Sequence, residues 1–129
     1  MNRIRMAAGL MAVSAVGCKG IQAVCPITPF PAVEVEVRYA ATEEPAWWGT
    51  RGIVQEGTFI DSLIAASDFP EDSTIPYLLA AAFDRPGTYD VTVEKTGFKT
   101  VHVTDVTATV DTECSQVIPA RVQVRLEPE

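Results

Sequence analysis

The stretch from residue 33 to residue 39 alternates apolar and charged side chains without a break. Valine or tyrosine stands at each odd position, and glutamate or arginine at each even one. Because successive side chains of a β-strand point to opposite faces, this period of two predicts a strand with one buried and one solvated face. Residues 89–93 and 122–126 repeat the pattern, which makes extended structure the dominant expectation for the chain.

Other short apolar segments fit the same architecture. Residues 52–55 and 58–63 flank a Glu56-Gly57 turn and predict a hairpin. The alanine-rich residues 77–83 favour helix by propensity, but their length and the turn that follows favour a buried strand. About seven strands and no amphipathic helix after residue 17 predict an all-β fold, an antiparallel two-sheet sandwich. The remaining expected segments are strands near residues 101–103 and 106–110 and a loop at residues 68–76.

The first 17 residues have the layout of a signal peptide. Arg3 and Arg5 precede an uncharged apolar stretch over residues 6–16, which is much shorter than the ~20 residues of a membrane-spanning helix. Residues 15–18, Ala-Val-Gly-Cys, resemble the bacterial lipobox, in which the cysteine receives lipid. Residues 1–17 are therefore predicted to be a lipoprotein signal peptide and Cys18 the lipidation site.

The lipobox match departs from the family's pattern at one position, because Ala15 stands where leucine is preferred. The alternative is ordinary cleavage after Ala15 or Gly17, which releases a soluble protein with a free Cys18 thiol. Two or more acyl chains anchor a protein stably, so lipidation would keep the domain at its membrane. The absence of aspartate after Cys18 resembles lipoproteins sent to the outer membrane. The expected location is thus the outer rather than the inner membrane, with the domain in the periplasm or at the cell surface.

The three cysteines fit this picture. With Cys18 acylated, Cys25 and Cys114 remain as a pair in an oxidising compartment and are predicted to form a disulfide. Residues 18–31 contain three prolines and predict an extended tether, and residues 32–129 form the sandwich domain.

A family resemblance supports the same fold. Residues 85–93, Arg-Pro-Gly-Thr-Tyr-Asp-Val-Thr-Val, together with Gly97-Phe98 and the closing residues 122–126, resemble the carboxypeptidase regulatory-like domain. That family has a seven-stranded, prealbumin-like sandwich, and the resemblance spans about residues 32–126. It implies a non-catalytic accessory module, because the family takes its name from neighbouring catalytic domains and not from an activity of its own.

Several functions are disfavoured by composition and motifs. A net charge of −7 opposes binding to nucleic acid. His102 is the only histidine and is expected on the surface, and no Gly-x-Ser-x-Gly motif is present, so an enzyme is not predicted. No cofactor and no metal site are expected. Asp68, Glu71 and Asp72 offer oxygen ligands for calcium, but without an EF-hand spacing they favour a hydrated loop.

Trp47-Trp48 is the candidate for ligand contact. Adjacent residues of a strand face opposite ways, so one ring is expected in the core and the other partly exposed. An exposed tryptophan stacks on a sugar or anchors a protein. Two hypotheses follow: a structural or protein-interaction module of the cell envelope that contacts another envelope protein, and a carbohydrate-binding module that uses Trp47 or Trp48.

Overall fold

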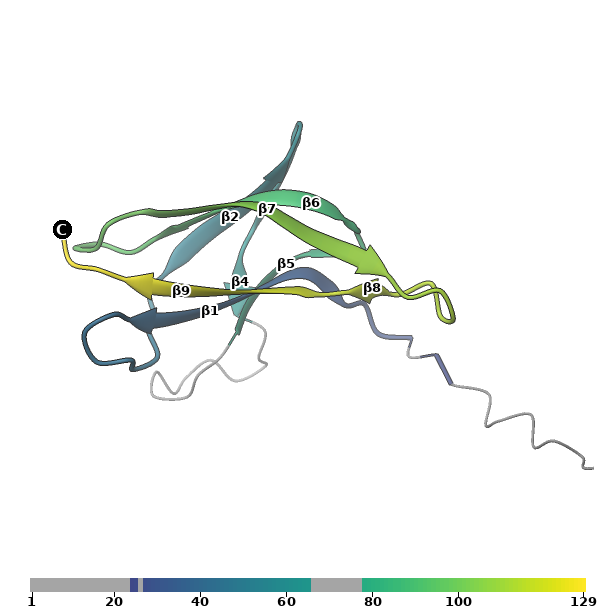
Figure 1. Cartoon of the computed structure of the whole chain (residues 1–129), viewed down its shortest axis with the longest axis horizontal. Helices are drawn as coiled ribbons and strands as arrows, with labels where there is room; N and C mark the ends of the chain where they lie inside the picture. Colours follow the sequence, from purple (N-terminus) through teal and green to yellow (C-terminus); the bar gives the residue numbers. More distant parts are fainter. Residues whose placement is uncertain (1–23, 26, 66–77) are drawn as a thin grey trace, which may run out of the picture.

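The computed structural model describes residues 24–25, 27–65 and 78–129, and these form two packed β-sheets without a helix (Figure 1). This confirms the predicted all-β sandwich. The four-stranded sheet has the order β4-β5-β1-β9, and the five-stranded sheet has the order β3-β2-β6-β7-β8. The strands are β1 (Pro31–Tyr39), β2 (Arg51–Glu56), β3 (Phe59–Ser62), β4 (Ile64–Ala65), β5 (Leu78–Phe83), β6 (Gly87–Glu94), β7 (Val101–Val110), β8 (Val117–Ile118) and β9 (Ala120–Leu126).

Strand β1 lies at the centre of the smaller sheet and begins one residue before the predicted domain start. Val33, Val35 and Val37 point into the core and are at most 2% exposed. The charged residues between them face outward, where Glu34 pairs with Arg121 of β9 at 3.0 Å. The alternation read from the sequence is therefore the real division between core and solvent faces.

One strand pair corrects the expectation of a purely antiparallel fold. β1 pairs with β5 in antiparallel fashion but with β9 in parallel, with Val35 opposite Val122 and Tyr39 opposite Leu126. A parallel pair needs a long connection. Here the whole remainder of the domain supplies it, since β9 arrives last and runs along the open edge of β1.

The larger sheet contains the predicted hairpin, formed by β2 and β3 around Gly57. Residues 101–110 form one continuous strand, β7, where two segments were expected. Asp105 in its middle has a φ of 58°, and the register against β6 shifts between Tyr89 and Val91. This irregularity is a β-bulge, which breaks the alternation without ending the strand.

At two corners the chain passes from one sheet to the other within a single residue. Leu63 separates β3 from β4, and its N–H donates to the Gly52 carbonyl at 2.9 Å. Pro119 separates β8 from β9 at the other side of the sandwich. Proline lacks a backbone N–H, so it suits a place where ladder pairing stops. The two corners connect the sheets along opposite edges.

The sandwich has two distinct ends. The disulfide end holds the start of β1, with Pro31 opposite Phe83, and the end of β7, with Val110 opposite Val117. The Trp48 end holds Tyr39 and the last strand residue, Leu126, and the C-terminus lies there as well (Figure 1). Between them lies a core of valines around Tyr89, and Leu126 completes this core at the Trp48 end; both Tyr89 and Leu126 are 0% exposed.

Candidate functional site

The two tryptophans have the opposite exposures that the sequence predicts. They follow β1 in the connection to β2, where Ala46 N–H donates to the Val37 carbonyl at 2.8 Å. Trp47 is 4% exposed and belongs to the core, whereas Trp48 is 51% exposed. Their centroids lie 5.2 Å apart at an interplanar angle of 80°. Trp47 thus holds its neighbour by an edge-to-face contact, the arrangement that aromatic pairs prefer.

A surface groove lies beside Trp48, and we call it the Trp48 groove. It consists of two adjoining hollows. The first, about 430 Å³, is lined by the two tryptophans, Leu63 and Leu79. The second, about 490 Å³, shares Thr50 and Leu63 with the first, and its lining also includes Ile53, Arg51, Ser62, Thr92 and Glu94.

The groove is built where β3 leaves the larger sheet at Leu63. A side chain at Gly52 would meet the Leu63 Cδ1 atom at 2.5 Å and the Thr92 carbonyl oxygen at 2.7 Å, so glycine is needed for this close approach. Lys95 Nζ donates to the Trp48 carbonyl oxygen and holds the backbone beneath the exposed ring. Sequence reasoning found the tryptophans but missed Leu63, Thr92 and Glu94, because only folding brings them alongside.

His102 lies on the exposed face of β7, as predicted. Its Nδ1 atom is 3.1 Å from the Thr92 hydroxyl on the neighbouring strand β6. Within residues 24–25, 27–65 and 78–129, no three histidine, cysteine or acidic side chains gather as metal ligands would. The acidic residues weighed for calcium, Asp68, Glu71 and Asp72, lie outside the described residues.

A second polar cluster, which sequence reasoning missed, surrounds Arg85. Its guanidinium donates to Glu56 Oε1 at 2.8 Å and to the Tyr89 hydroxyl at 3.0 Å, and it stacks 3.9 Å from the Phe59 ring centroid. The Tyr89 hydroxyl in turn donates to the Arg85 carbonyl at 2.5 Å. Arg85 and Tyr89 flank a Pro-Gly turn, and this spacing was the sequence feature that could have indicated the cluster.

The charges of this cluster are stabilised mutually. The pKa of Glu56 lies below its ordinary value, first because the Thr88 N–H donates to the carboxylate and second because Arg85 does. The pKa of Arg85 is raised, first by its hydrogen bond to Tyr89 and second by Glu56. Each group therefore stays ionised at neutral pH, which suits a structural clamp rather than proton transfer.

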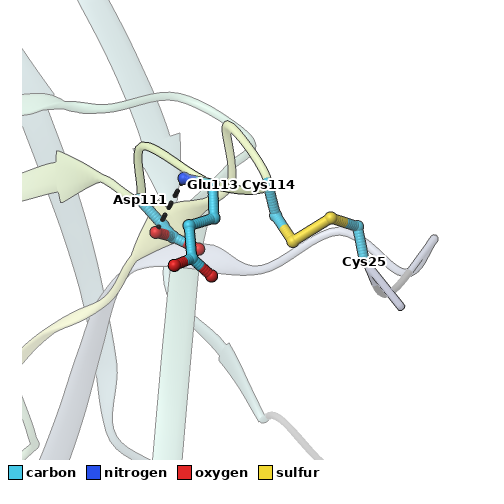
Figure 2. Close-up of a disulfide and its surroundings, with 4 residues drawn as sticks. All are labelled: Cys25, Asp111, Glu113 and Cys114. Carbon is cyan, nitrogen blue, oxygen red and sulfur yellow. Dashed lines mark hydrogen bonds between the residues drawn. A yellow bond between two sulfur atoms is a disulfide. The ribbon is translucent and has the colours of Figure 1, made fainter. Parts of the chain in front are cut away.

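The predicted disulfide is present between Cys25 and Cys114 (Figure 2). The Cα atoms are 5.4 Å apart, within the usual range for the bond. Cys114 sits in the turn between β7 and β8, where the Glu113 N–H donates to Asp111 Oδ1 at 3.1 Å. The bond fastens the segment before β1 to this turn, 89 residues away.

The described segments contain no helix long and apolar enough to cross a membrane. The predicted signal peptide and the predicted lipidation site, Cys18, lie outside the described residues. No family model matches the chain, and a search of the curated proteins finds no relative of it. The carboxypeptidase regulatory-like resemblance therefore stays a prediction from the motifs, beside a β-sandwich that is observed.

Proposed function

We propose that the chain is a non-catalytic module of the bacterial cell envelope, exported and anchored by lipid at Cys18. The observation that carries this proposal is the Cys25–Cys114 disulfide. Structural disulfides persist in oxidising compartments and are rare where thiols are kept reduced. The pairing also leaves Cys18 as the one remaining cysteine, next to the lipobox-like sequence. We place the anchor at the outer membrane and the domain in the periplasm or at the surface.

Mass spectrometry of the protein extracted from bacterial membranes tests the anchor. The expected result is a mature chain that begins at Cys18 and carries acyl groups, with Cys25 and Cys114 protected from alkylation unless reductant is added. Cys18→Ser should release the protein from the membrane fraction with its disulfide intact. A mature chain with an unmodified Cys18 thiol would overturn the anchor, and two free thiols at Cys25 and Cys114 would remove its main support.

The module's role in this proposal is binding or structural support, not catalysis. The charged groups around Arg85 are bound to one another and have pKa directions that keep them ionised, so they support a structural role. The family resemblance also points to an accessory module. An envelope protein that docks through an edge strand or a loop is the first partner class we propose.

A second candidate, carbohydrate binding, is favoured by the Trp48 groove. A half-exposed indole ring beside hydroxyl and charged groups is the combination that binds sugars, because the ring stacks on the apolar sugar face while polar groups bind its hydroxyls. Trp48 provides the ring at the first hollow, and Ser62, Thr92 and Glu94 line the second hollow, which adjoins it at Thr50 and Leu63.

Tryptophan fluorescence titration with peptidoglycan fragments and polysaccharides separates the two candidates. Glycan binding should quench or shift the emission, and Trp48→Ala should abolish the response. Phe83→Ala is the matched control, since Phe83 is 41% exposed at the opposite end of the sandwich and should leave the response unchanged. No spectral response to any glycan would remove the carbohydrate hypothesis and leave protein interaction.

A further inference from the structure

Exposed apolar side chains gather at the disulfide end. Five large apolar residues there are each at least 41% exposed, and we call them the apolar end surface: Val24, Ile27, Phe83, Val110 and Ile118. Single exposed apolar residues are ordinary on a protein surface, but a group at one end of a molecule marks a contact surface.

Strand register and the disulfide place these residues at the same end of the sandwich. Phe83 pairs with Pro31 at the start of β1, while Val110 and Ile118 belong to the paired ends of β7 and β8. β1 also contacts β8 directly. Val24 and Ile27 flank Cys25, which the disulfide holds against the turn that follows β7. The same end of the sandwich is where residues 27–30 lead into β1 (Figure 1).

We propose that the apolar end surface faces and contacts a lipid bilayer. The inference rests on the proposed anchor at Cys18. Only seven peptide steps separate Cys18 from Cys25, which is a reach of about 25 Å at most when fully extended. Because the disulfide fixes Cys25 to the sandwich, the free tether ends at Cys25 and not at Pro31. The disulfide end is therefore held close to the anchoring lipid. A bilayer is the apolar surface that lies within this reach.

The charges at this end select the kind of lipid. Asp84, Asp111 and Glu113 lie at the ends of β5 and β7, and Arg85 is already paired with Glu56. The local excess of negative charge repels anionic headgroups. The surface thus fits zwitterionic phospholipids, which it meets by apolar contact alone.

This arrangement directs the Trp48 groove away from the membrane. β1 runs from the disulfide end to the Trp48 end, and its nine residues span about 30 Å. The tryptophans follow the far end of this strand. The groove is then presented to the space beyond the membrane, where glycans and other envelope proteins are accessible.

Depth-dependent fluorescence quenching tests the surface. The chain from residue 18 onward, which contains every described residue, is coupled through the Cys18 thiol to a maleimide lipid in phosphatidylcholine vesicles with quenchers in the upper acyl region. Ile118→Trp introduces a reporter at the apolar end surface, and Trp47 and Trp48 report from the opposite end. The expected result is strong quenching of the introduced indole and little quenching of the native pair.

Two control variants sharpen the test. Ile53→Trp places an indole at another exposed isoleucine, on β2 toward the Trp48 end, and should be quenched no more than the native pair. Cys25→Ser with Cys114→Ser keeps the coupling at Cys18 but lengthens the free tether to Pro31, so the quenching at position 118 should fall. Adding phosphatidylglycerol to the vesicles should also lower the quenching at position 118. An increase in this quenching would overturn the assignment to neutral lipid.

Equal quenching at positions 118 and 53 would overturn the proposal. The proposal would also be overturned if a second copy of the chain covered the apolar end surface. The protein would then dimerise in a concentration-dependent way without vesicles, and Phe83→Ser would abolish the dimer. Chemical coupling makes the result independent of cellular acylation. An unmodified Cys18 in cells therefore contradicts the proposed function alone, while absent quenching contradicts the apolar end surface alone.

Discussion

Tyr89 and Arg85 clamp the turn between β5 and β6 through paired side-chain and backbone contacts. The Tyr89 ring is completely buried, and its hydroxyl both donates to the Arg85 carbonyl and accepts from the Arg85 guanidinium. Glu56 adds a third contact from β2, because its second carboxylate oxygen accepts the Thr88 N–H at 2.6 Å. One arginine thus ties the turn to the hairpin of the larger sheet.

Removing the Tyr89 hydroxyl should destabilise the fold. In Tyr89→Phe the Arg85 carbonyl loses its donor and the guanidinium loses an acceptor, while the ring volume is kept. We expect a loss of about 1 to 2 kcal/mol in the free energy of unfolding, measured by urea denaturation. Tyr39→Phe makes the same chemical change on a half-buried tyrosine outside the cluster and should have a smaller effect. Equal effects of the two changes would contradict the clamp.

Glu56 should make stability depend on pH in the acidic range. Its pKa is lowered in the folded protein, so its stabilising contribution is complete above its unfolded value near 4.5 and is lost as the pH falls through the lower folded value. Glu56→Gln should therefore flatten the acid limb of the stability curve relative to the wild type. Thermal unfolding of both proteins between neutral and acidic pH measures the difference. An unchanged acid limb would show that the Thr88 and Arg85 contacts do not hold the carboxylate in solution.

Part of the candidate site could be predicted from adjacent residues alone. The opposite exposures of Trp47 and Trp48 agree with the expectation for adjacent residues, although the pair lies in the β1–β2 connection and not in a strand. Apart from Thr50, the polar side chains of the second hollow come from β2, β3 and β6, and the Arg85 cluster comes from the same three strands together with the β5–β6 turn. Such groups meet only after strand register is chosen, and no local pattern in one sequence specifies that register.

At the scale of single elements, β5 contains an unusual backbone conformation. Ala82 has a φ of 57° although it is buried, and its N–H donates to Asp61 Oδ2 of β3 at 2.8 Å. The Asp61 carboxylate thus accepts the Ala82 N–H, and Ala82 is absent from the β1–β5 pairs. This contact between strands of opposite sheets fixes the end of β5 before the turn.

Replacing Ala82 with glycine should destabilise the fold less than replacing Ala81 with glycine. Both Ala81→Gly and Ala82→Gly remove a buried methyl, which stabilises by about 0.8 kcal/mol. Only at Ala82 does glycine also relieve a positive φ, which is unfavourable for alanine by about 1 kcal/mol. We therefore expect Ala82→Gly to be at least about 1 kcal/mol more stable than Ala81→Gly by denaturant unfolding. The reverse order would contradict the left-handed conformation at residue 82.

The strands themselves were largely predictable, and their pairing was not. Alternation located β1, β6 and β9, and the turn at Gly57 located the β2–β3 hairpin. The bulge at Asp105 hid the continuity of β7, because it shifts the period of two by one residue. The parallel pairing of β1 with β9 joins residues about 90 positions apart, which periodicity within a strand does not encode.

At the scale of the whole molecule, the disulfide joins the segment before β1 to the sandwich. Phe30 also holds this segment, because its side chain packs against the core and its carbonyl accepts the Asp84 N–H at 2.9 Å. Since Cys25 itself is exposed, the bond contributes by restricting the chain and not by filling the core. Its effects on stability and on the position of the N-terminal segment are therefore separable.

Cys25→Ser with Cys114→Ser should lower stability without changing the fold. The bond closes a loop of 89 residues, and chain entropy alone gives about 4 to 5 kcal/mol for a loop of this length. The observed loss should be smaller, because the segment before β1 gains freedom in the folded state once released, and that gain offsets part of the effect. Denaturant unfolding measures the loss, and limited proteolysis should show new cleavage near residues 24–30 while β1 to β9 stay protected. A loss of the full value with no new cleavage would mean that the segment is held by its own contacts, and the short-tether argument for the orientation of the domain would then not depend on the disulfide.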